Sequence, residues 1–408
     1  MSEIVPVGWK VEPLSDHASR VRSKNDIGNT NVLTASAIDG LINQREYFNK
    51  SVASSDISHY TLLRRGDFAY NKSYSHGYPV GVVRRLERYD LGVLSPLYIC
   101  FSLDSDECDE TYLSYYFDSY RFERELNSVV QEGARAHGLL NIPVNDFFDR
   151  ELLLPPLPEQ KKIASILTAV DEVIENTQKQ IDKLQDLKKA TMNELLTKGI
   201  GHTEFKDSEL GRIPKSWEVV SLDKVCKVRQ GLQIPIRDRF KGAATGRYPY
   251  LTVSWINSKF DSDKAEFIAN PNDSVVLKSN EFLVGRTGAV GQIFDGLECV
   301  FHNNFFAVSL LTDSVEKEFL KHFLKWHTTQ DLLLKLAGST TIPDLNHGDF
   351  YSINVGLPPV EEQCRVVSQV DSIDTTLREI RLKLNALMSL KKSLMQDLLT
   401  GKVRVSVH

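Results

Sequence analysis

The sequence is poor in features that mark a secreted, membrane-bound or metal-binding protein. Its first ten residues lack the charged-then-apolar pattern of a signal peptide, and no apolar run approaches the roughly 20 residues that span a bilayer. We therefore expect a cytoplasmic location. Scattered cysteines without a CxxC pair predict reduced thiols rather than a zinc site, and we expect no metal ligands. The 408 residues include only five cysteines: Cys100, Cys108, Cys226, Cys299 and Cys364.

Motifs of common catalytic sites are also missing. No glycine-rich cofactor loop follows a predicted strand, and no GxxxxGK[ST] phosphate loop occurs. An Asn/Asp-Pro-Pro-aromatic quartet is absent, since Leu154-Pro155-Pro156-Leu157 has neither the polar residue nor the aromatic one. We therefore expect a chain that is not an enzyme and binds no cofactor, with a stand-alone methyltransferase or nuclease as one alternative.

The sequence has no excess of positive charge. Its formal net charge is −5, which does not by itself indicate nucleic-acid binding. Bases nevertheless gather in two stretches, residues 61–88 and 224–247. Local patches, rather than the total charge, determine where a phosphate backbone can dock. Solvated faces are the alternative interpretation.

What the sequence does contain is a long internal repeat. Leu154–Leu196 and the stretch that begins at Leu357 align without a gap at an offset of 203 residues. They read LPPLPEQKKIASILTAVDEVIENTQKQIDKLQDLKKATMNELL and LPPVEEQCRVVSQVDSIDTTLREIRLKLNALMSLKKSLMQDLL. The repeat predicts a globular segment, a long helix, a second globular segment and a second long helix.

Each copy carries two apolar rows seven residues apart, which is the pattern of a coiled-coil seam. About 40 residues at ~1.5 Å each predict a rod of roughly 60 Å. Two ordinary core helices are the alternative. The predicted seam consists of Ile163, Leu167, Val170, Ile174, Ile181, Leu184 and Leu195 in the first copy, and of Val366, Val370, Ile373, Leu377, Ile380, Leu384, Leu387, Leu394 and Leu398 in the second.

The globular segments repeat more loosely. Pro6 and Trp9 open the first as Pro214 and Trp217 open the second, and both continue with short β-like runs. A helical pattern follows in each, over 111–130 and 317–336. The stretch 199–214 is polar and contains glycines, so it predicts a linker.

Two divergent globular segments, each followed by LPP-x-x-EQ and a long helix, resemble the specificity subunit of type I restriction-modification systems. The resemblance covers essentially the whole chain. In the second copy Glu361 replaces a proline, and Cys364-Arg365 replace the usual basic pair; neither change touches the heptads.

The resemblance implies that each globular segment is a target-recognition domain for one half of a bipartite double-stranded DNA site. It further implies an antiparallel helix pair that binds two methyltransferase (M) subunits, and restriction/translocase (R) subunits that join for cleavage. S-adenosylmethionine then belongs to the M subunit, and ATP and Mg to the R subunit. Half-sites about one turn, or roughly 10 bp, apart are expected. If the helices act as a ruler, inserting one helical turn near Leu195 shifts the spacer.

The expected fold is a mixed α/β (α+β) one, with two recognition domains in pseudo-twofold repeat and an antiparallel coiled coil. The expected boundaries are 1–153 for domain 1, 154–200 for spacer helix 1, 201–213 for a linker, 214–356 for domain 2, 357–402 for spacer helix 2 and 403–408 for a tail. A coiled-coil scaffold that binds only proteins is the second alternative, and DNA affinity that falls steeply with salt would exclude it.

Candidate DNA contacts follow from side-chain chemistry, because Arg and Lys suit guanine edges and Asn and Gln suit adenine edges. In the first segment they are Lys72, Tyr74, His76, Arg135 and His137, with Arg20, Arg22 and Lys24 on phosphates. In the second they are Gln230, Gln233, Arg237, Arg239, Arg286, Thr287, Asn303 and Asn304, with Lys224 and Lys227 on phosphates. His322 and His327 lie five apart and do not share a helix face, which argues against a metal site.

Overall fold

The computed structural model describes residues 5–37, 39–48, 53–73, 77–130, 140, 142–338 and 342–407. The chain divides into two compact units. Unit 1 combines Met1–Gln178 with Leu382–His408, and unit 2 is Lys179–Arg381. Each unit therefore contains one half of each long helix. Within the described ranges, no helix has the length and apolar character needed to cross a membrane.

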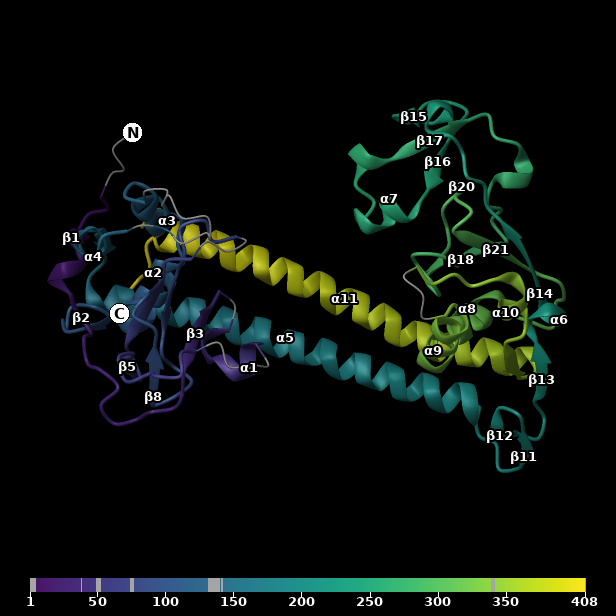
Figure 1. The fold of residues 1–408 in the computed structure, drawn as a ribbon, viewed down its shortest axis with the longest axis horizontal. Coiled ribbons are helices and arrows are strands. Elements are labelled where there is room, and N and C mark those ends of the chain that lie inside the picture. The colour runs from purple at the N-terminus through teal and green to yellow at the C-terminus, as the bar shows by residue number, and fades with distance from the viewer. Residues whose placement is uncertain are drawn as a thin grey trace. The chain divides into compact units, whose positions relative to one another are not determined.

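The two long helices are α5 (Leu157–Thr197) and α11 (Val360–Leu398), teal and yellow in Figure 1. Each begins three residues after the start of its repeat, because the first leucine of the repeat ends a strand. Leu154 is the last residue of β10 and Leu357 the last of β22. The prolines that follow have no N–H to donate, so they separate the strand from the helix. Two long helices are thus confirmed, with a later start than expected.

Unit 1 is built around an antiparallel sheet of order β2-β9-β6-β7, and β1 pairs with β10 at its base. Two further pairs, β3-β4 and β5-β8, form its outer part. The strands are β1 (Lys10–Pro13), β2 (Ala18–Arg20), β3 (Leu33–Ser36), β4 (Gly40–Asn43), β5 (Thr61–Arg64), β6 (Phe68–Asn71), β7 (Val82–Arg85), β8 (Leu91–Leu94), β9 (Ile99–Leu103) and β10 (Glu151–Leu154). The short helices are η1 (Leu14–Asp16), α1 (Gln44–Phe48), α2 (Glu110–Phe117), α3 (Tyr120–Asn127) and α4 (Val144–Phe148).

Unit 2 repeats this plan with a sheet of order β14-β21-β18-β19 and a base pair β13-β22. Its outer part is a different sheet, β15-β17-β16-β20. The strands are β11 (Phe205–Ser208), β12 (Gly211–Pro214), β13 (Glu218–Ser221), β14 (Cys226–Gln230), β15 (Phe240–Lys241), β16 (Arg247–Leu251), β17 (Glu266–Ala269), β18 (Phe282–Gly285), β19 (Ile293–Phe294), β20 (Val300–Phe301), β21 (Phe305–Leu310) and β22 (Asn354–Leu357). The short helices are α6 (Leu222–Val225), η2 (Ile236–Asp238), α7 (Val253–Asn257), η3 (Ser262–Lys264), η4 (Asp273–Val275), α8 (Lys317–Lys325), α9 (His327–Leu336) and α10 (His347–Tyr351).

The expected fold class is confirmed: two mixed segments repeat, each joined to a long helix. The repeat is closest in the base pair and central sheet of each unit, and it breaks down in the outer sheets. The two units therefore share the base pair and the central sheet, and they differ in their outer sheets.

The glutamate of the repeated Glu-Gln pair is buried and ties three parts of its unit together. In unit 1, Glu159 accepts hydrogen bonds from Trp9 Nε1 at 3.1 Å and from Arg404 Nε at 2.7 Å. In unit 2, Glu362 accepts from Trp217 Nε1 at 3.1 Å and contacts His202 Nε2 at 2.8 Å. Arg404 follows α11 and His202 follows α5, so each glutamate joins the start of its domain to the end of the other helix.

The glutamine beside it holds the loop that precedes α2 in unit 1 and α8 in unit 2. Gln160 accepts from the Asp109 N–H and donates to the Glu107 carbonyl, both at 2.8 Å. Gln363 accepts from the Glu316 N–H and donates to the Ser314 carbonyl, also both at 2.8 Å. Every polar atom of the amide is thus paired although the side chain is buried. The repeated sequence therefore fixes each domain on its helix.

Within each unit the two helix halves run antiparallel. One ion pair joins them in each unit, and the two ion pairs are formed by equivalent residues of the repeat. Lys391 Nζ lies 2.6 Å from Asp171 in unit 1, and Lys188 Nζ lies 2.6 Å from Asp374 in unit 2. The lysines are equivalent in the repeat, and so are the aspartates. Each copy therefore gives its lysine to the other copy's aspartate, which is the reciprocal contact of a twofold interface.

The predicted seam residues all lie inward on the helices. Ile163, Leu167, Ile181, Leu195, Val366, Val370, Leu377 and Leu398 are buried, and the other eight are half-buried. In unit 1, Ile163 and Leu167 share an apolar cluster with Leu398. In unit 2, Leu195 shares one with Val366 and Val370. Which residues pair across the seam along its full length stays a prediction.

The helical patterns predicted before the long helices are confirmed, but each forms a pair of helices, because Ser119 and Trp326 adopt extended backbone. Ser119 Oγ then accepts from the Phe122 N–H and starts α3. The expected linker 199–214 contains the hairpin β11-β12, in which Gly211 takes a positive φ of 87°.

Candidate nucleic-acid interface

The basic stretch of unit 1 is largely neutralised by acids from elsewhere in the fold. Arg84 Nη1 lies 2.5 Å from Asp118, and Arg85 Nη1 lies 3.1 Å from Glu110. Arg65 and Arg88 also pair, with Asp90 and Glu46. Four of its six bases therefore have acidic partners, and the side chains of two of them, Arg84 and Arg85, are largely covered. The positive surface is smaller than the six bases suggest.

Arg20 and Lys72 are the unit 1 candidates with charge available for a ligand. Arg20 is exposed on β2, and Lys72 directly follows β6. Burial, together with the nearby Arg20, lowers the pKa of Lys72. No acidic partner of either side chain occurs among the described residues. Two crowded cations of this kind favour an anion. Arg22 and Lys24 are exposed as well, and Lys24 Nζ donates to the His59 carbonyl at 3.1 Å.

Four other candidates of the first segment cannot be placed. Tyr74, His76, Arg135 and His137 lie outside the described residues.

In unit 2, three arginines form ion pairs with acidic side chains of the same unit. Arg229 makes a forked pair with the buried Glu281, at 2.6 and 3.1 Å. Arg239 Nη1 lies 2.9 Å from Glu266, and Arg286 Nη2 lies 2.6 Å from Asp344. These acids are 52, 27 and 58 residues away in sequence. Such arginines hold loops in place, and their guanidinium groups are already occupied.

The turn after β18 is held by contacts with two other segments of unit 2. Thr287 Oγ1 donates to Asp344 beside Arg286, and the Arg286 N–H donates to the Asn304 carbonyl at 2.8 Å. Asn303 accepts from Gln230 Nε2 at 3.1 Å through its carbonyl. The side chains of Asn303 and Asn304 are half-buried. Hydrogen bonds from Thr287 and Arg286 hold the pKa of Asp344 below its ordinary value, although burial opposes them.

From the last residue of β14 to the first of β16, residues 230–247 form a largely exposed segment with η2 and β15 in it, which we call the prong loop. Gln233 is exposed at its start, and the Arg237 side chain is 85% exposed at its tip. Among the described residues, the acid partner of Arg237 is its neighbour Asp238, at 3.8 Å. Further along, Arg247 stacks on the Phe240 ring at 4.5 Å. Lys227, on β14, is exposed, and Lys224 lies 3.5 Å from Asp223.

Beside this loop lies a cleft of about 480 Å³, whose lining combines two sequence candidates, Arg239 and Asn304, with polar residues that the sequence analysis did not select. His302 is half-buried there, and burial lowers its pKa. Its Nδ1 accepts from the Asn304 N–H at 3.2 Å, which leaves Nε2–H as a donor. Thr252, Ser254 and Lys264 line the same cleft. No local motif marks these residues, since three separate segments supply them.

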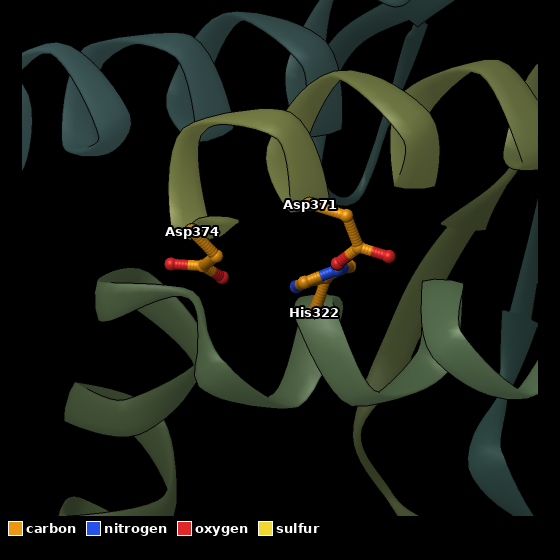
Figure 2. Close-up of side chains that lie close together, drawn as sticks. All are labelled: His322, Asp371 and Asp374. Carbon is orange, nitrogen blue, oxygen red and sulfur yellow. The ribbon is translucent and has the colours of Figure 1, made fainter. Parts of the chain in front are cut away.

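One group in the described ranges has the spacing of metal ligands, and it is shown in Figure 2. His322 Nε2 lies 2.8 Å from Asp371 Oδ1, and Asp374 accepts from Lys188 Nζ at 2.6 and 2.7 Å. A dication would have to displace the Lys188 ammonium. Burial and the neighbouring Lys321 and Lys188 lower the pKa of Lys325 close by. Because positive charge is already crowded there, the group serves to join α8 to the long helices.

All five cysteines are free. Burial raises the pKa of the Cys100 and Cys226 thiols to about 12, so these two are unreactive core residues.

Comparison with known proteins places this arrangement in one family. The family model described as "Type I restriction modification DNA specificity domain" matches residues 85–186 and 214–387, which is more than half of the chain. The MjaVIII specificity subunit of Methanocaldococcus jannaschii is 28% identical over 325 residues, covering 77% of this chain and 75% of that protein. The putative MjaX specificity subunit of the same organism is 26% identical over 424 residues, covering 98% and 95%.

Solved structures share the fold. A chain in a structure of the type I R-M system has a TM-score of 0.62 at 17% identity, covering 98% of this chain and all of that one. The type I restriction-modification S subunit from M. genitalium has a TM-score of 0.56 at 15% identity, with 98% of each chain covered. These two similarities support the architecture of two domains and two long helices.

Proposed function

Because the chain belongs to the family of type I restriction-modification DNA specificity domains, we propose that it selects the DNA sequence on which such a complex acts. Each unit reads one half of a bipartite site through its outer part. The observation that carries this proposal is the contrast between the repeated and unrepeated parts. The same hydrogen bond from a tryptophan to the repeated glutamate and the same central sheet recur in both units, while the outer sheets differ.

We propose that the direct DNA contacts come from the side chains that the fold leaves available. In unit 1 these are Arg20 and Lys72, with Arg22 and Lys24 on phosphates. In unit 2 these are Gln233, Arg237 and Lys227, with Lys224 more peripheral. The remaining described candidates, which are Gln230, Arg239, Arg286, Thr287, Asn303 and Asn304, position the loops from which the reading residues project. Exposed bases near amide side chains suit a surface that contacts phosphates and base edges together.

We propose further that the long helices dock two methyltransferase subunits. Leu187 on α5 and Leu390 on α11 are equivalent in the repeat, and both are exposed, at 52% and 49%. Two equivalent apolar sites suit two copies of one partner. S-adenosylmethionine is bound by that partner, and ATP and Mg by the restriction subunits, so this chain contributes recognition and no chemistry.

The first test is a map of adenine methylation in the native cell, with and without the gene. The proposal expects one bipartite motif, two short specified parts around a fixed gap, to lose its methylation when the gene is deleted. Retention of every methylated motif, together with purification of an intact methyltransferase complex that contains this chain, would contradict it.

The salt dependence of DNA binding distinguishes DNA recognition from the alternative of a scaffold that binds only proteins. A chain that contacts phosphates releases counterions, so its affinity falls steeply between 50 and 200 mM salt, by roughly a thousandfold for several contacts. A scaffold would show no specific binding to the mapped motif at any salt concentration.

A further inference from the structure

The tip of the prong loop combines exposure with an apolar side chain, and the candidate list from the sequence did not include it. Ile236 is 77% exposed, between Pro235 and the 85%-exposed Arg237. We propose that Pro235-Ile236 is an apolar wedge that inserts against the base pairs of the bound duplex, with Arg237 on the adjacent phosphate. This inference rests on the proposed DNA recognition and adds the part that deforms the DNA.

Hydrogen bonds from Tyr250 and Arg239 hold the chain next to this tip. The buried Tyr250 donates its hydroxyl to the Leu232 carbonyl at 2.6 Å and accepts from the Ile234 N–H at 3.1 Å. Arg239 contacts the same residue: its Nε and Nη2 donate to the Ile234 carbonyl at 2.9 and 2.6 Å. The residues on either side of the turn 235–238 are therefore joined directly, from Arg239 to Ile234.

Arg239 is itself held in place by two neighbouring side chains, Glu266 and Tyr250. Glu266 holds Arg239 at 2.9 Å, and the guanidinium lies over the Tyr250 ring at 5.1 Å. At the tip, the Asp238 N–H donates to the Pro235 carbonyl at 3.0 Å and closes the turn η2. An exposed isoleucine on a mobile loop would have no particular meaning, since scattered apolar residues are common on surfaces. On a fastened turn, the ordering cost of binding is already met before the ligand arrives.

Charge favours DNA as the occupant. Within residues 224–247 the only acid is Asp238, and it lies beside Arg237. Lys241, which is exposed and lies 3.8 Å from Glu266, and the stacked Arg247 follow on the same loop. Isoleucine and proline are among the side chains that proteins insert between base steps, unstacking them and kinking the duplex. A wedge with flanking cations matches that use, and Arg239 and Tyr250 are its positioning residues.

The test uses the full chain assembled with its methyltransferase partner. The probe is a duplex carrying the methylated motif, with 2-aminopurine placed one position at a time across the half read by unit 2, and with donor and acceptor dyes at its ends. Wild type should raise 2-aminopurine fluorescence at one step outside the methylated adenine and bring the ends closer. Ile236→Ala should abolish both signals and weaken binding about tenfold.

Leu311→Ala is the matched control, because Leu311 is an exposed leucine of unit 2, at 55%, outside the prong loop. It should behave as wild type. Arg239→Met should reproduce part of the Ile236→Ala loss without changing the assembly of the complex, as expected of a positioning residue.

Three outcomes overturn the wedge. The first is specific binding by Ile236→Ala with unchanged end distance and unchanged 2-aminopurine signals. The second is loss of methyltransferase subunits from Ile236→Ala in the absence of DNA, which would make the tip a protein contact. The third is specific binding by wild type with no unstacked step. Failure of wild type to prefer the mapped motif over a scrambled duplex would instead refute the proposed function itself.

Discussion

Glu362 illustrates how much a single buried residue of the repeat contributes. It is 3% exposed and faces Trp217, His202 and the Ile200 N–H. Glu362→Gln keeps the shape but removes the charge that these donors share, so we expect unfolding of unit 2 to become easier by about 2 kcal/mol. Urea unfolding followed by tryptophan fluorescence measures this. Glu361→Gln is the control: Glu361 is the exposed neighbour on the same helix turn, and its substitution should change nothing.

The Arg229–Glu281 pair makes a prediction about pH. Burial opposes ionisation of Glu281, yet hydrogen bonds from Arg229 and from the Lys278 N–H hold its pKa below the ordinary value of 4.5. A lowered pKa in the folded state means that the pair stabilises unit 2 fully above that ordinary value. The stabilisation is lost as pH falls through the folded-state pKa.

Glu281→Gln should therefore destabilise unit 2 by about 2 kcal/mol at pH 7 and flatten the loss of stability between neutral and acidic pH. Urea midpoints measured from pH 7 down to pH 3, for wild type and variant, test this. Parallel curves for the two proteins would show that another carboxylate governs the acid transition.

At the residue scale the sequence predicts the type of contact but not its availability. Arg229, Arg239 and Arg286 look like DNA-contacting bases because their partner acids are distant in sequence. Only folding brings Glu281, Glu266 and Asp344 beside them. The lining of the cleft at His302 is hidden for the same reason.

At the scale of helices and strands, the reciprocal ion pairs predict a testable symmetry. Lys188→Glu places a carboxylate against Asp374, where the two side chains are 23% and 32% exposed in the native pair. We expect destabilisation, and we expect Asp374→Lys to restore stability when both changes are present. The coupling energy should be about 1 kcal/mol, because the pair is partly exposed.

The equivalent double change at Lys391 and Asp171 in unit 1 is the internal control and should give a coupling of the same sign. Absence of coupling in both pairs, measured by thermal unfolding of all four proteins in each cycle, would remove these contacts from the account of helix pairing.

Long elements were the most predictable, because periodicity over about 40 residues outweighs local ambiguity. The apolar patterns before α5 and α11 were also helical, but their breaks were not visible in the sequence. Ser119 is the N-cap of α3. A serine inside an apolar pattern does not by itself predict that a new helix begins there. The start of α5 was predicted too early because Leu154 has a strand partner, Lys10, that is far away in the chain.

At the scale of the whole molecule, the proposed docking of two partners rests on two equivalent sites. Leu187→Asp and Leu390→Asp should each reduce the bound methyltransferase from two copies to one, and the double variant should bind none. Native mass spectrometry of the purified complexes measures the copy number. Leu210→Asp, at an exposed leucine of the β11-β12 hairpin, is the control and should retain both copies. Equal occupancy in all variants would place the partner elsewhere.

The ruler hypothesis also takes a sharper form from the fold. An insertion near Leu195 alone would fail, because Leu195 is 6% exposed in the core of unit 2 and the Lys188–Asp374 contact fixes the local register. The boundary between the units falls at Gln178 on α5 and at Arg381 on α11, two positions that are equivalent in the repeat. Seven residues inserted after both keep the heptads in phase.

Seven residues at ~1.5 Å each add roughly 10 Å, or about 3 bp at ~3.4 Å per pair. If helix length sets the gap, the methylation motif of the double insertion should keep both specified halves and gain about 3 bp between them. The two single insertions are the controls: each puts its helix out of register with the other and should abolish methylation. A double insertion that methylates the original motif would show that the helices hold the domains without measuring the gap.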